Sequence, residues 1–503
     1  MTGASDPLRN GLADSVSLDA LFRANAAARP DAIALVDPSN REGFTDGAPL
    51  RLTYTEVNER IDRLSRRLAS FAMPAGSVVA VQLPTLAEAI ISLLAISRSG
   101  LVAAPVPMLW RRSDLVAALA SVAPKAMICL SRLDDERPAE IVCEAAAELF
   151  DLSFPCAFGA DVPDGVVALD HNDALEGANP SPSAHAKADA VSLVTFDTDA
   201  DGFYAAGRND AQWLAAGLAA FLEAKMKSGD TIVTTLPFNS LAGIAGAFVP
   251  WLLCGGTLEL IHGHAPEAVG AAGANKRAHL VGPAAALREI TRQRRTPFTS
   301  CIAVHRGGSR HDGDLSNIPS ERIVDFHSFG EAAVIAIARD ERQHARAIPL
   351  GGISAPSAAV GAPIVVETRI AEGQVWLRGP IIPRLQFPAT GERSRLKQDG
   401  DGFVSTGFRC HSDGNGGLIV EAGPERVVSV GGLRFGLNDL RLRFSECGND
   451  IKVTAVDDPL LGQRLHIEAA NPDEAIAVMR AAGHSRLIID ATVESGSRPA
   501  ASL

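Results

Sequence analysis

Apolar and polar positions along the first half of the chain follow two alternating periods. Over residues 55–72, Val57, Ile61, Leu64 and Leu68 recur at the spacing of a helix with one buried face. Short runs rich in β-branched residues, such as SVVAVQL over 77–83, stand between the helical segments. Further helices are expected at 16–30, 86–99, 114–120, 210–227 and 244–253, and further strands at 101–107, 126–130, 192–196, 231–236 and 257–261. This alternation predicts an α/β fold with doubly wound, mostly parallel sheets.

The pattern changes after residue 360. Short β runs, VVETRI and QVWLRG, are separated by Gly and Pro, and they predict a small β subdomain at about 360–424. From residue 425 to 503 strands and helices mix, with a clear helix at 475–482. The expected organisation is a large N-terminal domain over 16–424, followed by a small α+β domain over 425–503.

Charge and cysteine content narrow the function classes. The formal net charge of −12 disfavours nucleic-acid binding, which requires a basic face. Seven scattered cysteines without a CxxC pair are typical of free thiols in a reducing cytoplasm. The apolar stretch 243–253 is too short to span a bilayer and contains Pro250. We therefore expect a cytoplasmic protein without a transmembrane segment; a peripheral membrane role stays open.

Six segments, taken in order, resemble the adenylate-forming superfamily of acyl- and aryl-CoA synthetases, luciferases and peptide-synthetase adenylation domains. They are LTYTEVNERIDRLSRRLA at 52–69, LPFNSLAG at 236–243, GQVWLRGP at 373–380, DGFVSTG at 401–407, VVSVGGLRFGLNDLR at 427–441 and DDPLLGQ at 457–463. The resemblance implies the fold predicted above, with a small C-terminal domain that moves like a lid. It also implies a ligase that joins a carboxylate to AMP with ATP and Mg²⁺, then transfers it to CoA or a carrier arm.

The phosphate-binding loop departs from the family pattern. The family's Ser-Gly-Thr-Thr-Gly-x-Pro-Lys loop resembles FDTDADGFYA at 196–205, in which Ala205 replaces the lysine. Like charges about 4 Å apart repel by about 1 kcal/mol even in water, so an acidic loop would repel a triphosphate. The degenerate loop comprises Asp197, Thr198, Asp199, Asp201 and Gly202.

An acidic loop can instead bind a cation, and the alternate spacing of these aspartates resembles a calcium loop. The twelfth position, which should hold a bidentate glutamate, is Arg208. We therefore expect a solvated acidic turn and no metal site.

The family's Tyr-Gly-x-Thr-Glu motif resembles FGEAAV at 329–334. Phe329 keeps the ring that would stack on adenine and Gly330 is retained, but Ala333 stands where the Mg²⁺-binding glutamate should be. Glu331, two residues earlier, either assumes that role after a backbone shift or is a surface carboxylate. The sequence leaves both readings open.

Three more family groups are altered. The Thr-Gly-Asp motif becomes Thr406-Gly407-Phe408, and a phenyl ring cannot accept hydrogen bonds from ribose hydroxyls. Aligned back from Gly431-Gly432, the hinge segment has Ala422-Gly423 where the family has its Gly-Arg pair, so the hinge arginine is absent from its matched position and Arg426 is the nearby candidate. The last segment has Ser497 at the position of the catalytic lysine, with Arg498 beside it. Arg498 is a rigid fork and not a compact ammonium, so whether it can replace the lysine stays open.

The resemblance also assigns the residues that line the cleft. The remnants of the nucleotide pocket are Gly307, Gly308, Phe329, Gly330 and Thr406. The candidates for the acyl pocket are Asn239, Ser240, His327 and Ser328. His327 either lines a ligand or lies at a strand end.

These departures favour a catalytically degenerate synthetase-like protein over an enzyme. Its binding partner would be a small carboxylate or acyl or aryl ligand, CoA or a carrier arm, or a partner enzyme; a homodimer is also open. The first alternative is an active, divergent carboxylate–CoA ligase using Glu331, Arg498 or Arg426, and only then would ATP, Mg²⁺ and CoA be required. The second is a ligand-free scaffold whose cleft is filled by side chains such as Phe408 and Tyr204.

Overall fold

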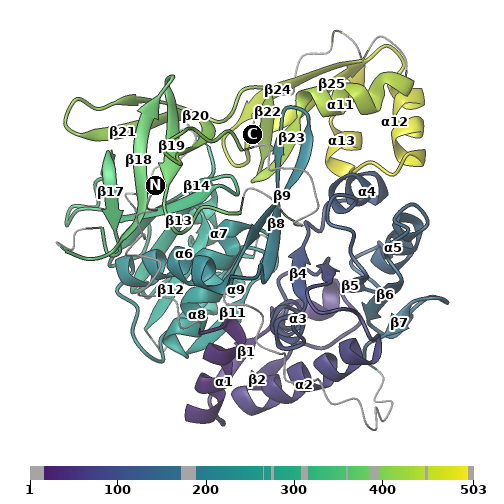
Figure 1. The fold of residues 1–503 in the computed structure, drawn as a ribbon, viewed down its shortest axis with the longest axis horizontal. Coiled ribbons are helices and arrows are strands. Elements are labelled where there is room, and N and C mark those ends of the chain that lie inside the picture. The colour runs from purple at the N-terminus through teal and green to yellow at the C-terminus, as the bar shows by residue number, and fades with distance from the viewer. Residues whose placement is uncertain are drawn as a thin grey trace, which may run out of the picture.

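The computed structural model describes residues 16–170, 189–263, 265–273, 277–307, 315, 317–357, 361–384, 387, 396–447, 451–494 and 496. Two mainly parallel sheets form the body of the molecule, a β subdomain lies at the upper left of the view, and a C-terminal unit lies at its top and upper right (Figure 1). This arrangement confirms the predicted α/β fold class.

The first sheet has the order β7-β6-β5-β3-β4-β8-β9, and only its last pair is antiparallel. Its strands are β3 (Val78–Val81), β4 (Val102–Pro105), β5 (Ala126–Leu130), β6 (Phe154–Phe158), β7 (Val167–Ala168), β8 (Leu193–Asp199) and β9 (Gly202–Arg208). The helices that alternate with them are α3 (Ala87–Arg98), α4 (Arg112–Leu119) and α5 (Pro138–Ala146).

The second sheet has the order β15-β14-β13-β12-β10-β11-β1-β2, with an antiparallel pair at each edge. Its strands are β1 (Ile33–Val36), β2 (Arg51–Thr53), β10 (Thr231–Thr234), β11 (Thr257–Leu260), β12 (Ala278–Pro283), β13 (Ser300–His305), β14 (Ile323–Phe329) and β15 (Ala333–Ala338). The helices around it are α1 (Leu18–Ala28), α2 (Tyr54–Ser70), α6 (Asp210–Glu223), α7 (Leu241–Gly243), α8 (Val249–Cys254), α9 (Pro266–Ala271) and α10 (Leu287–Ile290).

The remaining strands form two antiparallel-rich sheets. The β subdomain contains β16 (Ile348–Pro349), β17 (Gly351–Ser354), β18 (Ile364–Ala371), β19 (Gln374–Arg378), β20 (Val404–Ser412) and β21 (Gly417–Ala422). We call residues 427–494 the C-terminal unit. It contains β22 (Val427–Val430), β23 (Leu433–Gly436), α11 (Leu437–Arg443), β24 (Lys452–Asp458), β25 (Gly462–Ala469), α12 (Pro472–Ala481), α13 (Arg486–Asp490) and β26 (Thr492–Glu494).

Helix α2 shows how local sequence signals fix an element. Thr53 caps its first turn: the Thr53 hydroxyl accepts from the Glu56 N–H, and the Glu56 carboxylate accepts from the Thr53 N–H. The apolar positions predicted to share one face, Val57 to Leu68, are all buried. The helix thus begins where its cap stands and buries the face that its period predicts.

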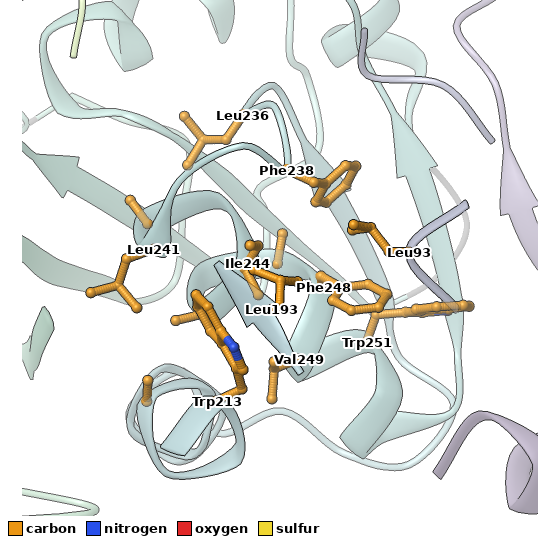
Figure 2. Packing of buried hydrophobic residues seen from close by; sticks show 14 of the residues in the cluster. Leu93, Leu193, Trp213, Leu236, Phe238, Leu241, Ile244, Phe248, Val249 and Trp251 are labelled. Carbon is orange, nitrogen blue, oxygen red and sulfur yellow. The ribbon is translucent and has the colours of Figure 1, made fainter. Parts of the chain in front are cut away.

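A continuous aliphatic and aromatic core joins the two large sheets. Trp213 of α6 and Trp251 of α8 are fully buried in it. Figure 2 shows these rings among Leu193, Leu241, Ile244, Phe248 and Val249. Between α7 and α8 the helix widens into a π-helical turn over Ile244–Phe248. Because α7 begins at the cleft, this packing fixes the position of one wall of the candidate site.

No helix in the described ranges combines the length and the apolar character that a bilayer span requires.

Candidate functional site

The segment that resembles a phosphate loop is a tight β-hairpin. Strands β8 and β9 pair residue for residue, from Leu193 opposite Arg208 to Asp199 opposite Gly202. Only Ala200 and Asp201 remain for the turn, and Gly202 has a positive φ of 130°. The hairpin therefore replaces the open Gly-rich loop that the resemblance implies.

Asp197 is the best-connected carboxylate of this hairpin. It is 4% exposed, and its oxygens accept from the Thr198 and Glu331 N–H groups, each at 2.8 Å. The Tyr204 hydroxyl donates to it at 3.0 Å, and the Arg434 guanidinium pairs with it at 2.6 Å. The expectation of a solvated acidic turn is wrong for Asp197, because Arg434, 237 residues away, supplies its counter-charge.

The other two aspartates lie at the hairpin tip rather than beside Asp197. Asp199 accepts from the Asp201 N–H at 2.8 Å, and exposed Asp201 accepts from the Asn438 side chain at 2.9 Å. Within the residues that the structure describes, no group of three or more His, Cys, Asp or Glu side chains is arranged to hold a metal ion.

Glu331 is buried at 6% exposure, so of the two readings of this residue the surface carboxylate is wrong. Its carboxylate accepts from the Leu241 N–H at 2.7 Å and so caps the first turn of α7. Burial, reinforced by the Asp197 charge, raises the pKa of Glu331 to about 7. The group is therefore poised near neutral pH.

Aromatic rings pack together at two of the positions that the resemblance assigns to adenine and ribose. Phe329 and Phe408 are each 2% exposed, and they pack edge-on with ring centroids 5.3 Å apart. The hydroxyl of Thr406 donates to the Val375 carbonyl at 2.8 Å. Because Phe329 is buried, a base could stack on its ring only after neighbouring side chains move.

A cavity of about 390 Å³ remains open in the cleft. Of the expected acyl-pocket residues, Asn239, Ser240 and Ser328 line it. His327 is not among its lining residues; its ring stacks on His305 with centroids 4.9 Å apart. Apolar walls come from the first sheet's side of the cleft, including Pro107, Met108, Leu109 and Trp110.

Arg306 and Arg434 also line this cavity, and neither was singled out from the sequence. Arg434 pairs with Asp197, but Arg306 has no carboxylate within ion-pair distance among the described residues. Among the residues that the structure describes, Arg306 donates to the Ser240 hydroxyl at 3.3 Å and the Gly431 carbonyl at 3.2 Å. Burial lowers its pKa. A cation at an apolar wall without a carboxylate partner favours an anionic ligand group. The family motif includes Gly307 but not Arg306, so the positive charge of Arg306 was the one feature of the sequence that could have drawn attention to it.

A second cavity, of about 910 Å³, lies between the second sheet and the C-terminal unit. Gly307 and Arg426 line it, and Arg426 has a positive φ of 59°. Gly308 and Arg498 lie outside the described residues.

A third polar cluster is structural. His279 contacts the Ser300 hydroxyl and the Asp230 carboxylate, each at 2.8 Å, in a Ser–His–Asp row. Its members are 5% exposed or less, and none of them lines either cavity described above. A nucleophile needs access to its substrate, so this row stabilises strands β12 and β13 rather than forming a hydrolytic site.

Part of the chain matches a known protein family and several curated proteins. A family model described as AMP-binding enzyme matches residues 22–196. The beauvericin nonribosomal cyclodepsipeptide synthetase BEA1 of Gibberella fujikuroi is 34% identical over 114 residues, which is 23% of this chain and 3% of that protein. The chain spans only 3% to 7% of the length of the first curated relatives that it matches.

Solved structures match the chain over nearly its full length. MbtA of Mycobacterium smegmatis superposes with a TM-score of 0.65 at 17% identity, covering 97% of this chain and 93% of that chain. The o-succinylbenzoate CoA synthetase MenE of Bacillus subtilis superposes with a TM-score of 0.70 at 12% identity, covering 95% and 96%. At such identities the likeness establishes the fold.

Proposed function

Since this chain belongs to the AMP-binding superfamily of adenylate-forming enzymes, we propose that it keeps the fold as a binding protein and does not form adenylates. The buried Asp197 carries the proposal. In the resemblance its segment would surround a triphosphate with N–H donors and a lysine. Here a carboxylate stands in that segment, with a guanidinium already paired to it.

The residues present do not fit Mg²⁺-ATP. A triphosphate would have to displace Arg434 from Asp197 and then lie against an unneutralised carboxylate, at a cost of several kcal/mol in a buried setting. The adenine position is closed by the contact between Phe329 and Phe408. The adenine half would thus meet packed aromatic rings and the phosphate half a carboxylate that is already paired, which supports a nucleotide-independent role.

The 390 Å³ cavity supports an organic anion with an apolar acyl or aryl body as the ligand. Its apolar wall would contact the body, and Arg306 would pair with the anionic group. The relative BEA1 is named a nonribosomal synthetase, so we extend the proposal to a carrier-bound acyl group, delivered by a carrier protein or partner enzyme.

Pyrophosphate exchange decides whether adenylation is lost. The purified chain is incubated with ATP, Mg²⁺, labelled pyrophosphate and a panel of aryl and aliphatic carboxylates, with an active acid–CoA ligase as the positive control. We expect exchange no higher than without a carboxylate. Calorimetry with Mg²⁺-ATP should give no binding heat, because the phosphate segment is already neutralised internally.

The same panel tests ligand binding without ATP. A carboxylate that fits the cavity should raise the unfolding temperature in a concentration-dependent manner. Carboxylate-dependent exchange above background would instead establish an active, divergent ligase. If neither the carboxylate panel nor a carrier-linked acyl probe gave exchange or binding, the remaining explanation would be a ligand-free interaction scaffold.

A further inference from the structure

The C-terminal unit rests directly on the hairpin that replaces the phosphate loop, since β23 contacts both β8 and β9. We propose that the β8–β9 hairpin is a latch that fixes the C-terminal unit in one position on the large domain. The resemblance implies a lid that swings, whereas this contact would hold the lid in place. The inference concerns the position of this unit and does not depend on what the cavity binds.

The centre of the latch is the ion pair between Asp197 and Arg434. Their side chains are 2% and 11% exposed, so solvent screens the pair weakly. Gly330, with a φ of 58°, makes room for it: a Cβ atom there would lie 2.2 Å from both the Arg434 Nη1 and the Asp197 Oδ2. The Arg434 guanidinium also lies 5.4 Å from the centroid of the Phe408 ring. Gly330 thus leaves space for the ion pair, and Phe408 packs beside the guanidinium of Arg434.

The tip of the hairpin caps helix α11. The carbonyl of Ala200 accepts from the Asn438 and Asp439 N–H groups at 3.0 and 3.1 Å. The amides of a first helical turn have no acceptor within their own helix, so this carbonyl replaces the usual cap. Gly436 permits the approach, because a Cβ there would lie 2.3 Å from the Asp199 carbonyl oxygen.

A second set of contacts fixes the other side of the C-terminal unit to α4. Arg443 pairs with buried Asp114 at 3.1 Å, and the Ser113 N–H donates to the Gly483 carbonyl at 3.0 Å. The Arg112 guanidinium donates to the Ala481 carbonyl at 2.8 Å. With attachments to both the hairpin and α4, a rotation of the unit about its connection to β21 would break both sets together.

Hydrogen exchange of α11 tests the latch in the full-length chain. The amides of Asn438 and Asp439 are protected by Ala200 of the large domain, so their exchange reports docking of the unit. We expect Arg434→Met and Asp197→Asn each to speed this exchange about tenfold, as for loss of one charge-assisted hydrogen bond. The double variant should be no faster than the faster single variant, because both remove the same pair.

Arg441→Met is the matched control, since it removes an exposed arginine from the same helix without disturbing a contact to the hairpin. Exchange in β13 and β25 should stay unchanged in every variant. Unaltered α11 exchange in Arg434→Met and Asp197→Asn would overturn the latch. So would equal acceleration in β25, which would mean that Arg434 stabilises the core of the unit rather than its docking.

Discussion

On one side of the cleft, Asn239, Ser240 and Arg306 border a cavity of about 390 Å³. On the other side, Phe329 and Phe408 pack against each other and Asp197 pairs with Arg434. The same family pattern assigns residues to both sides. The first set of positions keeps room and an arginine without a carboxylate partner among the described residues. At the second set the two rings are packed together, and Asp197, although it lines the same cavity, already has its charge paired.

This difference shows that an acyl cavity and a triphosphate site have different physical requirements. A binding cavity needs shape, and apolar walls survive many substitutions at small cost. A triphosphate site needs several preorganised donors that act as a unit, so losing some removes the value of the rest. Once that value is gone, filling the space with Phe408 stabilises the fold by burying apolar surface.

Reversing the filled side should have the largest effect. Phe408→Asp restores the aspartate that the resemblance expects but places a carboxylate in a position that is 2% exposed. We expect it to lower the free energy of unfolding by about 3 kcal/mol or more, measured by urea denaturation. Phe408→Leu, the control, should lose less than half as much. Binding of Mg²⁺-ATP by Phe408→Asp would break the comparison, since one residue would then have reopened the nucleotide side.

The buried acid between the two sides should make stability depend on pH. The pKa of Glu331 is about 7 in the folded protein, above the ordinary value of 4.5 in the unfolded chain. Between these values the folded state binds more protons, so this group's contribution to stability falls as pH rises and is constant above pH 7. Glu331→Gln should match wild type near pH 4.5 and be more stable by on the order of 2 kcal/mol at pH 8. The measurement is urea unfolding at pH 5, 6, 7 and 8; a difference independent of pH would mean that Glu331 stays ionised.

Replacing Arg306 tests whether the open cavity binds an anionic ligand. Arg306→Leu should weaken binding of a carboxylate found in the panel about tenfold, since it removes one charge-assisted contact. Calorimetry gives the affinity, and a neutral amide analogue of the same ligand is the control, because its binding should be nearly unaffected. Equal losses for acid and amide would show that Arg306 contributes shape rather than charge.

The smallest effect is expected at the exposed hairpin tip. Asp201→Ala removes the acceptor of the Asn438 side chain but leaves the Ala200 carbonyl in place. We expect a change in the docking free energy of the C-terminal unit below about 0.5 kcal/mol, measured by exchange at Asn438 and Asp439. Asp164→Ala, exposed and outside the hairpin, is the control. A larger change in docking free energy would mean that the hairpin tip, and not Asp197, contributes most to docking.

The elements that the sequence predicted well are those with strong local signals. The strand at 126–130 matches β5 residue for residue, and the helix expected at 55–72 is α2, shifted by its Thr53 cap. Period and capping act over a few residues, so they are readable without partners. The hairpin was missed because Asp, Ala and Gly over 199–202 are typical of loops, whereas strand pairing and Arg434 hold it.

The sequence indicated which positions could line the site, but not how buried those residues are or which charges they pair with. Motif alignment assigned Asn239, Ser240, His327 and Ser328 to an acyl pocket. All of them except His327 line one cavity, and the acyl pocket itself stays a prediction. The alignment could not tell that Glu331 is buried or that Asp197 is neutralised, because both depend on residues distant in the sequence. Arg306 and Arg434 gain their roles in the same manner, from groups that meet only in the folded chain.

The two-residue turn of the hairpin also has a meaning for the history of this chain. A phosphate cradle needs spare backbone N–H groups, but those of Thr198 and Asp201 already donate to the carboxylates of Asp197 and Asp199. The segment has the same number of residues as the family's loop, so the loss lies in its side chains and not in its length. Restoring the cradle would require changing residues 199, 200, 201, 204 and 205 together, because donors that act as a unit gain little one at a time, and this makes the loss of the loop close to a one-way step.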